Sequence, residues 1–273
     1  MARHVIKDQA LAAVAAVQFL TRLPMPIEVP FERRMLARSV VYFPVAGLLI
    51  GVIAGGAAWL LGYVLPPWPA AVLTLAIWIG LSGGLHIDGW MDAADGVLSN
   101  RPRERMLDIM KDSRVGAMGV LAAVLLLLLK ASLLAEVIGD ESATGGWAFL
   151  LIVMASCFGR ASMAIAIAGW PPARKDEGLG SMFNDVNKFQ AATSAVLALI
   201  ISLATLLIND MNLVYSVSIS LIGLLLMSST VAMLGTWFCR KLGGLTGDTY
   251  GAINEAVEAL LLVAAVIAIH MWS

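Results

Sequence analysis

The chain has 273 residues, of which 60% are hydrophobic and 14% are charged, and its formal net charge is −1. Soluble domains carry about 25% charged residues, so a water-soluble fold of this length would expose too much apolar surface. The composition excludes a soluble enzyme, a disordered chain and a nucleic-acid-binding domain, and it indicates a helical protein that crosses a membrane several times.

The first apolar stretch, Leu11–Leu20, follows Arg3 and Lys7 and superficially resembles the apolar region of a secretory signal. The segment Thr21-Arg22-Leu23-Pro24 follows directly, without the small residues of a cleavage site. We therefore expect this stretch to be retained as an interfacial or re-entrant helix in front of the membrane spans.

Seven later stretches are long and apolar enough to cross a bilayer, whose hydrocarbon core takes about 20 helical residues. Their apolar runs are continuous rather than alternating, which favours helices over the strands of a β-barrel. The sequence therefore predicts an all-α, polytopic membrane protein, with residues 1–273 forming a single integral membrane domain. The expected spans are Val41–Leu65, Trp68–Leu85, Gly116–Ala135, Trp147–Gly169, Ala191–Ile208, Leu213–Phe238 and Ala256–Met271.

Along the chain, connecting segments that carry Lys or Arg alternate with connecting segments that carry none. Two of the 18 Lys and Arg residues, Lys130 and Arg160, lie inside spans, and the others all fall on the side of the N-terminus. The positive-inside rule places that side in the cytoplasm, so the C-terminus is expected outside. These cations are Arg3, Lys7, Arg22, Arg33, Arg34, Arg38, Arg101, Arg103, Arg105, Lys111, Arg114, Arg174, Lys175, Lys188, Arg240 and Lys241.

Three aspartates directly follow the second predicted span. Asp88, Asp92 and Asp95 are spaced so that a helix places them on one face, within about 60° of one another. No Lys or Arg between residues 86 and 100 balances their mutual repulsion. A divalent cation would balance this repulsion. Ligands that are all oxygen atoms favour Mg²⁺, Mn²⁺ or Ca²⁺ over zinc. The alternative is a solvated helix end, whose aspartates only cap the helix.

A basic segment precedes the third predicted span. Lys111 and Arg114 lie three residues apart, next to Gly116 and Gly119. Cations and small residues beside a metal–carboxylate face predict a phosphate site. The alternative is a positively charged anchor that only sets the topology.

A glycine-rich motif, Gly243-Gly244-Leu245-Thr246-Gly247-Asp248-Thr249-Tyr250-Gly251-Ala252, occupies the last cytoplasmic loop of this topology. Its backbone N–H groups can bind phosphate, and Asp248 is a candidate metal ligand or base. A plain turn is the alternative. The polar residues Asn254, Glu255 and Glu258 continue into the seventh span, where an inward-facing role is expected.

Two cations inside predicted spans need anionic partners. Arg160 either binds a substrate phosphate or carboxamide, or forms a structural ion pair with an acidic residue. For Lys130 we expect snorkelling or pairing with Glu136.

At these motifs the chain resembles the cobalamin synthase family, the adenosylcobinamide-GDP ribazoletransferases. The resemblance covers the whole chain in the same order. It is carried by Phe19-Leu20-Thr21-Arg22-Leu23-Pro24, Tyr42-Phe43-Pro44-Val45-Ala46-Gly47, the run from Gly83 to Gly96, Met110 to Gly119, and Gly243 to Ala252.

The resemblance implies a transferase of the final assembly step of the cobalamin (vitamin B12) nucleotide loop. Such an enzyme joins adenosylcobinamide-GDP to α-ribazole, or its 5′-phosphate, and releases GMP. The family is described as Mg²⁺-dependent and integral to the bacterial inner membrane, so these substrates and membrane lipid are the expected partners. The sequence does not give the oligomeric state, and a homo-oligomer is compatible with it.

Applied to this chain, the residue pattern and the resemblance together predict a complete set of roles. Asp88, Asp92 and Asp95 would coordinate Mg²⁺, and the catalytic base would be Asp95 or His86. The opposite loop would complete the site through Thr246, Gly247 and the catalytic Asp248. Substrate-binding residues would also include Lys111, Arg114, Arg160 and Asn254.

Two other functions fit parts of the pattern. CDP-alcohol phosphotransferases also carry spaced aspartates at the membrane face, but their motif continues with Ala-Arg where this chain has Val97-Leu98, and no downstream aspartate pair follows Gly119. A cation transporter would place its acids near the midplane, often on broken helices. Here the acids cluster on one side, beside a basic loop.

Overall fold

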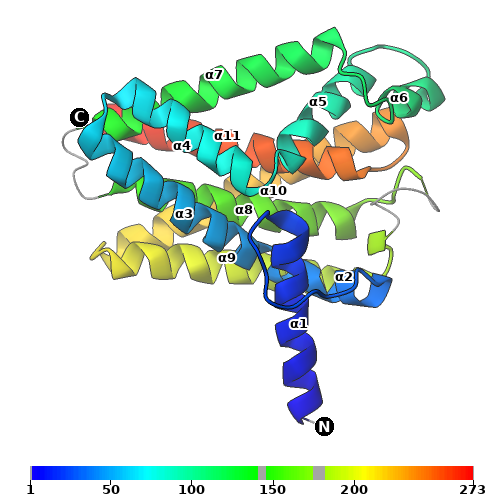
Figure 1. Ribbon diagram of the computed structural model, residues 1–273, viewed down its shortest axis with the longest axis horizontal. Helices are drawn as coiled ribbons and strands as arrows, with labels where there is room; N and C mark the ends of the chain where they lie inside the picture. Colours follow the sequence, from blue (N-terminus) through cyan, green and yellow to red (C-terminus); the bar gives the residue numbers. More distant parts are fainter. Residues whose placement is uncertain (1, 141–145, 175–181, 273) are drawn as a thin grey trace.

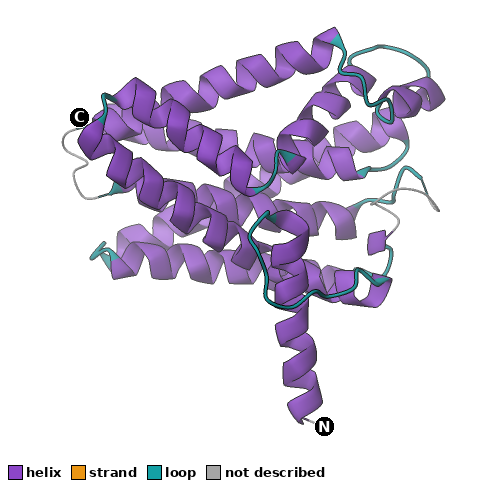
Figure 2. Ribbon diagram, viewed as in Figure 1, coloured by secondary structure: helices purple, strands orange, loops and turns teal. Residues whose placement is uncertain are grey.

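A computed structural model describes residues 2–140, 146–174 and 182–272. In these ranges the regular structure is helical, apart from one isolated bridge between Pro172 and Leu245 (Figure 2). Of the cations assigned to the cytoplasmic side, Lys175 and the side chain of Arg3 lie outside the described part.

Six helices in the described ranges are long and apolar enough to cross a membrane, or seven if the bent pair α4–α5 forms one span. The predicted all-α, multi-pass fold is therefore confirmed. The helices are α1 (Ala2–Leu20), α2 (Arg33–Ser39), the 3-10 helix η1 (Val40–Tyr42), α3 (Phe43–Val64), α4 (Pro67–Leu81), α5 (Leu85–Val97), α6 (Arg103–Ile109), α7 (Ala117–Gly139), α8 (Trp147–Gly169), α9 (Lys188–Ile208), α10 (Leu213–Leu242) and α11 (Gly247–Trp272).

The second predicted span, Trp68–Leu85, does not form one long helix. Helix α4 has 15 residues, too few to cross a core of about 30 Å alone, and the chain turns by 89° between α4 and α5. Gly83 and Gly84 form the turn with φ angles of +64° and +75°, which favour glycine. The Arg22 side chain packs over Gly83, and the backbone N–H of Arg22 donates to the Leu81 carbonyl at 2.7 Å. The bend gives the aspartate-bearing α5 its own direction.

Helix α1 projects away from the bundle in Figure 1. It contains the predicted helix Leu11–Leu20 but begins earlier, at Ala2. Its second half is anchored, because Ala15, Ala16 and Leu20 are fully buried.

Helices α3 and α8 pack closely because glycines on α3 follow a four-residue spacing. Gly47, Gly51 and Gly55 all face α8. A Cβ at Gly51 would lie 2.6 Å from the Cα of Val153, and one at Gly47 would collide with the Ser156 carbonyl. Such small-residue stripes allow close contact between membrane helices. The result is a largely buried α8, on which Arg160 is 1% exposed.

The bundle has two distinct ends, and the C-terminus lies at the end opposite α6 (Figure 1). At the α6 end, the segments 171–173 and 243–246 are joined by backbone hydrogen bonds from Ala173 to Leu245 (2.8 Å) and from Leu245 to Pro171 (2.9 Å). Two of the loops that carry cations in the sequence, beside Arg174 and beside Arg240 and Lys241, therefore meet at one end of the fold.

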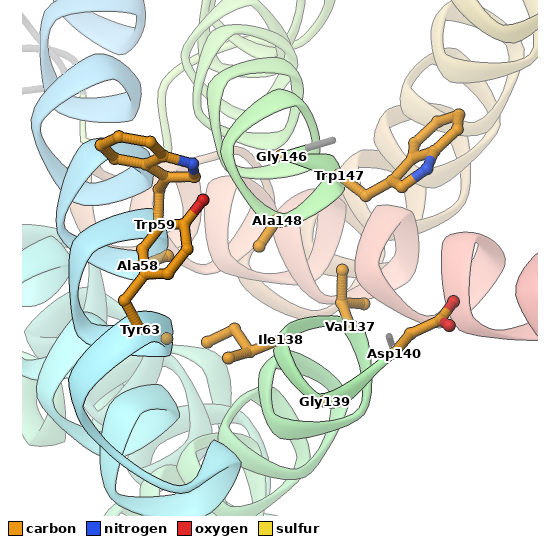
Figure 3. A pocket seen from close by; sticks show the side chains of 11 residues that line it. Ala58, Trp59, Tyr63, Val137, Ile138, Gly139, Asp140, Gly146, Trp147 and Ala148 are labelled. Atoms are coloured by element: carbon orange, nitrogen blue, oxygen red, sulfur yellow. The ribbon is translucent and has the colours of Figure 1, made fainter. Parts of the chain in front are cut away.

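A cavity of about 260 Å³ opens at the other end, between α3, α7 and α8 (Figure 3). Its rim carries Trp59, Tyr63 and Trp147, and the rings of Trp59 and Tyr63 meet edge to face with centroids 5.2 Å apart. Trp and Tyr are typical of membrane–water interfaces. None of the predicted site residues lines this cavity, so the candidate site lies elsewhere.

Candidate active site

The predicted acidic helix is confirmed as α5, and it packs closely against α11. Two glycines permit this contact. A Cβ at Gly89 would lie 2.8 Å from the carbonyl oxygen of Asp248, and one at Gly251 would lie 3.2 Å from the Cα of His86. Asp88 is exposed and Asp92 is half-buried on the acidic face of α5. Asp92 lies within electrostatic reach of Asp248, so the two distant motifs meet in one site.

The glycine-rich motif is half loop and half helix. Helix α11 begins at Gly247, well before the predicted span start at Ala256. Thr246 and Thr249 cap it reciprocally: the Thr249 N–H donates to Thr246 Oγ1 at 3.3 Å, and the Thr246 N–H donates to Thr249 Oγ1 at 2.9 Å. The Thr246 hydroxyl also donates to Asp248 Oδ2 at 3.2 Å. The positive N-terminus of α11 thus lies beside Asp248.

Asp95 has a structural role that its position in the sequence does not reveal. Its Oδ2 accepts the Gly116 N–H and its Oδ1 accepts the Gly119 N–H, both at 2.7 Å. A Cβ at either glycine would collide with the carboxylate. Asp95 of α5 therefore caps α7. Each oxygen keeps a second lone pair, so a metal or base role for Asp95 stays a prediction.

Asp95→Ala should destabilise the fold by about 1–2 kcal/mol, because it leaves two N–H groups at the start of α7 without acceptors. The expected result is a Tm lowered by several degrees in detergent. The amide oxygen of Asp95→Asn still accepts one hydrogen bond, so its Tm should lie between those of the wild type and Asp95→Ala. An unchanged Tm in Asp95→Ala would refute the capping role.

The two predicted phosphate-binding cations are exposed in the connection between α6 and α7. Arg114 donates to Asp112 through Nε at 3.0 Å and through Nη2 at 2.7 Å. These hydrogen bonds lower the pKa of Asp112 to about 2. The Arg114 side chain remains 87% accessible, so this pair leaves the guanidinium open to solvent. Phosphate binding by Lys111 and Arg114 stays a prediction.

A second polar group lies inside the bundle, and we call it the buried charge cluster. Its members are at most 5% exposed. They are His86 of α5, Lys130 of α7, Arg160 of α8, and Asn254, Glu255 and Glu258 of α11.

The cluster shows that the expected partner of Lys130 was wrong. It also places three predicted site residues, His86, Arg160 and Asn254, inside the bundle. Lys130 contacts Glu255 and Glu258 rather than Glu136, because a separation of six residues turns Glu136 about 120° away from Lys130 around α7. Glu136 lies 3.7 Å from His270 instead. Arg160 pairs with Glu258, the structural alternative considered for it, and Asn254 donates to the same carboxylate at 3.2 Å.

His86 belongs to this cluster and not to the acidic face. It precedes Asp88 by two residues, which separates them by about 160° around the helix. Its Nδ1 lies 3.4 Å from Arg160 Nη2. The geometry therefore gives no support to His86 as the base.

Two arginines that were interpreted only as topology determinants fasten the loops behind the site. Arg103 Nη2 donates to the Ala173 carbonyl at 3.1 Å and lies against Gly243, and Arg174 donates to the Leu107 carbonyl. These contacts join α6 to residues 173–174 and to the first residue of the glycine-rich motif. Their partners are remote in sequence, so no local pattern reveals them.

The carboxylate oxygens of Asp88, Asp92 and Asp248 are suitable ligands for a divalent cation that prefers oxygen. Within the described ranges, Asp88 and Asp92 accept no hydrogen bond and form no ion pair, although they share a face with like-charged neighbours. No three His, Cys, Asp or Glu side chains in those ranges are already gathered closely enough to bind a metal. A cation would therefore have to draw Asp88 and Asp92 together, with Asp248 opposite.

Fold and site together define a multi-pass membrane enzyme whose acidic residues gather near one end of a helical bundle. Comparison with known sequences makes the assignment more specific. The chain belongs to the cobalamin-5-phosphate synthase family, whose sequence model matches residues 12–266. No solved structure shows a significant match.

Relatives from distant bacteria align over nearly their full lengths. A protein of Brevibacillus brevis is 41% identical over 253 residues, covering 92% of this chain and 96% of the relative. One from a Roseiflexus species is 40% identical, covering 90% and 86%. One from Trichormus variabilis is 36% identical, covering 94% and 97%. All three are named adenosylcobinamide-GDP ribazoletransferase.

Proposed function

We propose that this chain joins adenosylcobinamide-GDP to α-ribazole, or to its 5′-phosphate, and releases GMP with the help of Mg²⁺. The observation that carries the proposal is the meeting of α5 and α11, which sets the acidic face with Asp92 near Asp248. The proposal places this site on the cytoplasmic side of the inner membrane, where the positive-inside rule puts the basic loops.

In this reaction the 5′-hydroxyl oxygen of α-ribazole bonds to the cobinamide-side phosphorus, and the bond from that phosphorus to the GMP oxygen breaks. Asp88 and Asp92 would hold Mg²⁺, with Asp95 as a further candidate ligand. The bound cation would neutralise charge on the pyrophosphate and polarise its oxygens.

Protein groups would supply the remaining steps. The N-terminus of α11 at Gly247, together with Lys111 and Arg114, would bind phosphate oxygens. Asp248 is the base that the geometry favours, because both oxygens of Asp95 accept N–H groups and His86 faces the bundle interior. Asp248 would accept the hydroxyl proton as the new phosphorus–oxygen bond forms.

The test is turnover by the purified protein in detergent, supplied with adenosylcobinamide-GDP, α-ribazole and Mg²⁺. We expect one GMP for each corrinoid product, and no GMP when α-ribazole is left out. A parallel reaction with α-ribazole 5′-phosphate shows which acceptor is preferred. Consumption of neither substrate by correctly folded protein would overturn the proposal.

A further inference from the structure

The buried charge cluster lies on the same two helices that carry the acidic site. Glu255 is two turns beyond Asp248 on α11, and His86 is two residues before Asp88 on α5. The cluster therefore shares α5 and α11 with the acidic site. Helices α7 and α8 reach it through Lys130 and Arg160.

Lys130 bridges two carboxylates of α11. Its Nζ lies 2.7 Å from Glu255 Oε2 and 2.5 Å from Glu258 Oε2. The same ammonium lies over the Trp78 ring of α4, 4.8 Å from the centroid, a distance typical of a cation–π contact. One side chain thus connects α4, α7 and α11.

The charges of the cluster balance. Two cations, Lys130 and Arg160, face two carboxylates, Glu255 and Glu258, and all four are at least nine-tenths buried. Burying ions is costly, and a balanced group of them adds little stability compared with apolar packing. Removing one member leaves an uncompensated buried charge, however, which is strongly destabilising. The cluster therefore favours the helix arrangement in which all four charges are paired.

Arg160 is directed at helices, not at solvent. It is 1% exposed, with Nη1 donating to Glu258 and Nη2 lying 3.4 Å from His86 Nδ1. A guanidinium only donates hydrogen bonds, so Nδ1 of His86 is the acceptor. Arg160 thereby links α11 to the first turn of α5. Both terminal nitrogens contact protein, while Nε has no hydrogen-bond partner among the described residues. With the side chain 1% exposed, these contacts favour a structural role over the predicted contact with substrate.

We propose that Lys130 and Arg160 are positioning residues, which hold α5 and α11 in the arrangement that sets Asp88 and Asp92 opposite Asp248. This inference rests on the proposed function, because it assigns the cluster to the same reaction. Positioning residues change kcat while substrate affinity stays constant, since displacements of about 1 Å at reacting groups cost about a hundredfold in rate.

The first test compares Lys130→Met with the double variant Lys130→Met/Glu255→Gln. The single variant leaves two carboxylates with one cation, and we expect kcat to fall about a hundredfold with KM unchanged. The double variant removes one charge of each sign and should recover at least about tenfold of that loss. A double variant no more active than the single one would overturn the proposal. If Lys130→Met does not fold, the double variant is compared with the wild type, and a kcat below one-hundredth of the wild-type value overturns it.

The second test separates positioning from substrate binding at Arg160. Arg160→Lys keeps the positive charge but loses the two-sided contact with Glu258 and His86. We expect kcat to fall and KM for adenosylcobinamide-GDP to stay at the wild-type value. A raised KM with unchanged kcat would show that Arg160 binds substrate and would overturn the proposal.

Ser156→Ala is the matched control on α8. Ser156 lies one turn before Arg160, is fully buried, and its hydroxyl has no hydrogen-bond partner within the described residues. Wild-type kcat and KM are expected, so a loss equal to that of Arg160→Lys would overturn the special role of the cluster. The wild type in the same assay tests the proposed function separately. Its inactivity would refute that function, whereas active wild type with unchanged kcat in both Lys130→Met and Arg160→Lys refutes only the positioning role.

Discussion

Replacing Asp92 by asparagine should lower turnover by on the order of a thousandfold or more, while the fold is retained. The substitution keeps the shape of the side chain but removes a charge from the centre of the acidic face. Asp92 is the carboxylate within electrostatic reach of Asp88, Asp95 and Asp248, so its loss affects cation binding most directly. A cation that stabilises phosphoryl transfer contributes several kcal/mol, which corresponds to that loss in rate.

The measurement is GMP release at increasing Mg²⁺ concentrations, with a melting curve to verify folding. Asp108→Asn is the matched control, because Asp108 is an exposed aspartate on α6, outside the acidic face. It should behave as the wild type does. If Asp92→Asn retains the Mg²⁺-dependent turnover of the wild type, the assignment of the metal site is wrong.

Gly89→Ala should reduce turnover about a hundredfold without touching a charged group. The added Cβ would lie 2.8 Å from the Asp248 carbonyl oxygen and 3.0 Å from its Cα. Backbone atoms cannot rotate away as a side chain can, so α5 and α11 must separate. Overpacking of this kind also destabilises by about 1–3 kcal/mol, and a lower Tm is therefore expected.

Gly80→Ala provides the control for that experiment. Gly80 lies in α4, and a Cβ there would meet no atom within 4 Å. Alanine favours helix more than glycine does, so an unchanged or slightly raised Tm and normal turnover are expected. Normal turnover in Gly89→Ala would show that the close contact of α5 with α11 is dispensable.

Features governed by local composition could be predicted from the sequence. The span Trp147–Gly169 agrees with α8 at both ends, because apolar length alone determines which segment can cross a bilayer. The acidic face of α5 was predictable for a similar reason, since the helical repeat alone places Asp88 and Asp92 together. The four-residue spacing of Gly47, Gly51 and Gly55 also carries a signal of close helix packing, although no such contact was predicted from it.

Features that depend on remote partners could not be predicted. Gly83 and Gly84 lie in an almost continuous apolar run, which conceals the bend after α4. Asp95 accepts hydrogen bonds from residues 21 and 24 positions away, and Lys130 contacts residues 125 and 128 positions away. Nearby Glu136 was the natural local choice for Lys130. Only the packing of α7 against α11 shows that two buried carboxylates on α11 replace it.

Binding of Mn²⁺ by the purified protein, without substrates, tests the central claim most directly. Free Mn²⁺ is followed by electron paramagnetic resonance in the wild type and in the double variant Asp88→Asn/Asp92→Asn. We expect saturable binding that Mg²⁺ displaces, and binding weaker by more than about tenfold in the variant, since even partners that only orient a metal ligand contribute that much. Equal Mn²⁺ affinity in the two proteins would contradict a divalent-cation site on the acidic face of α5.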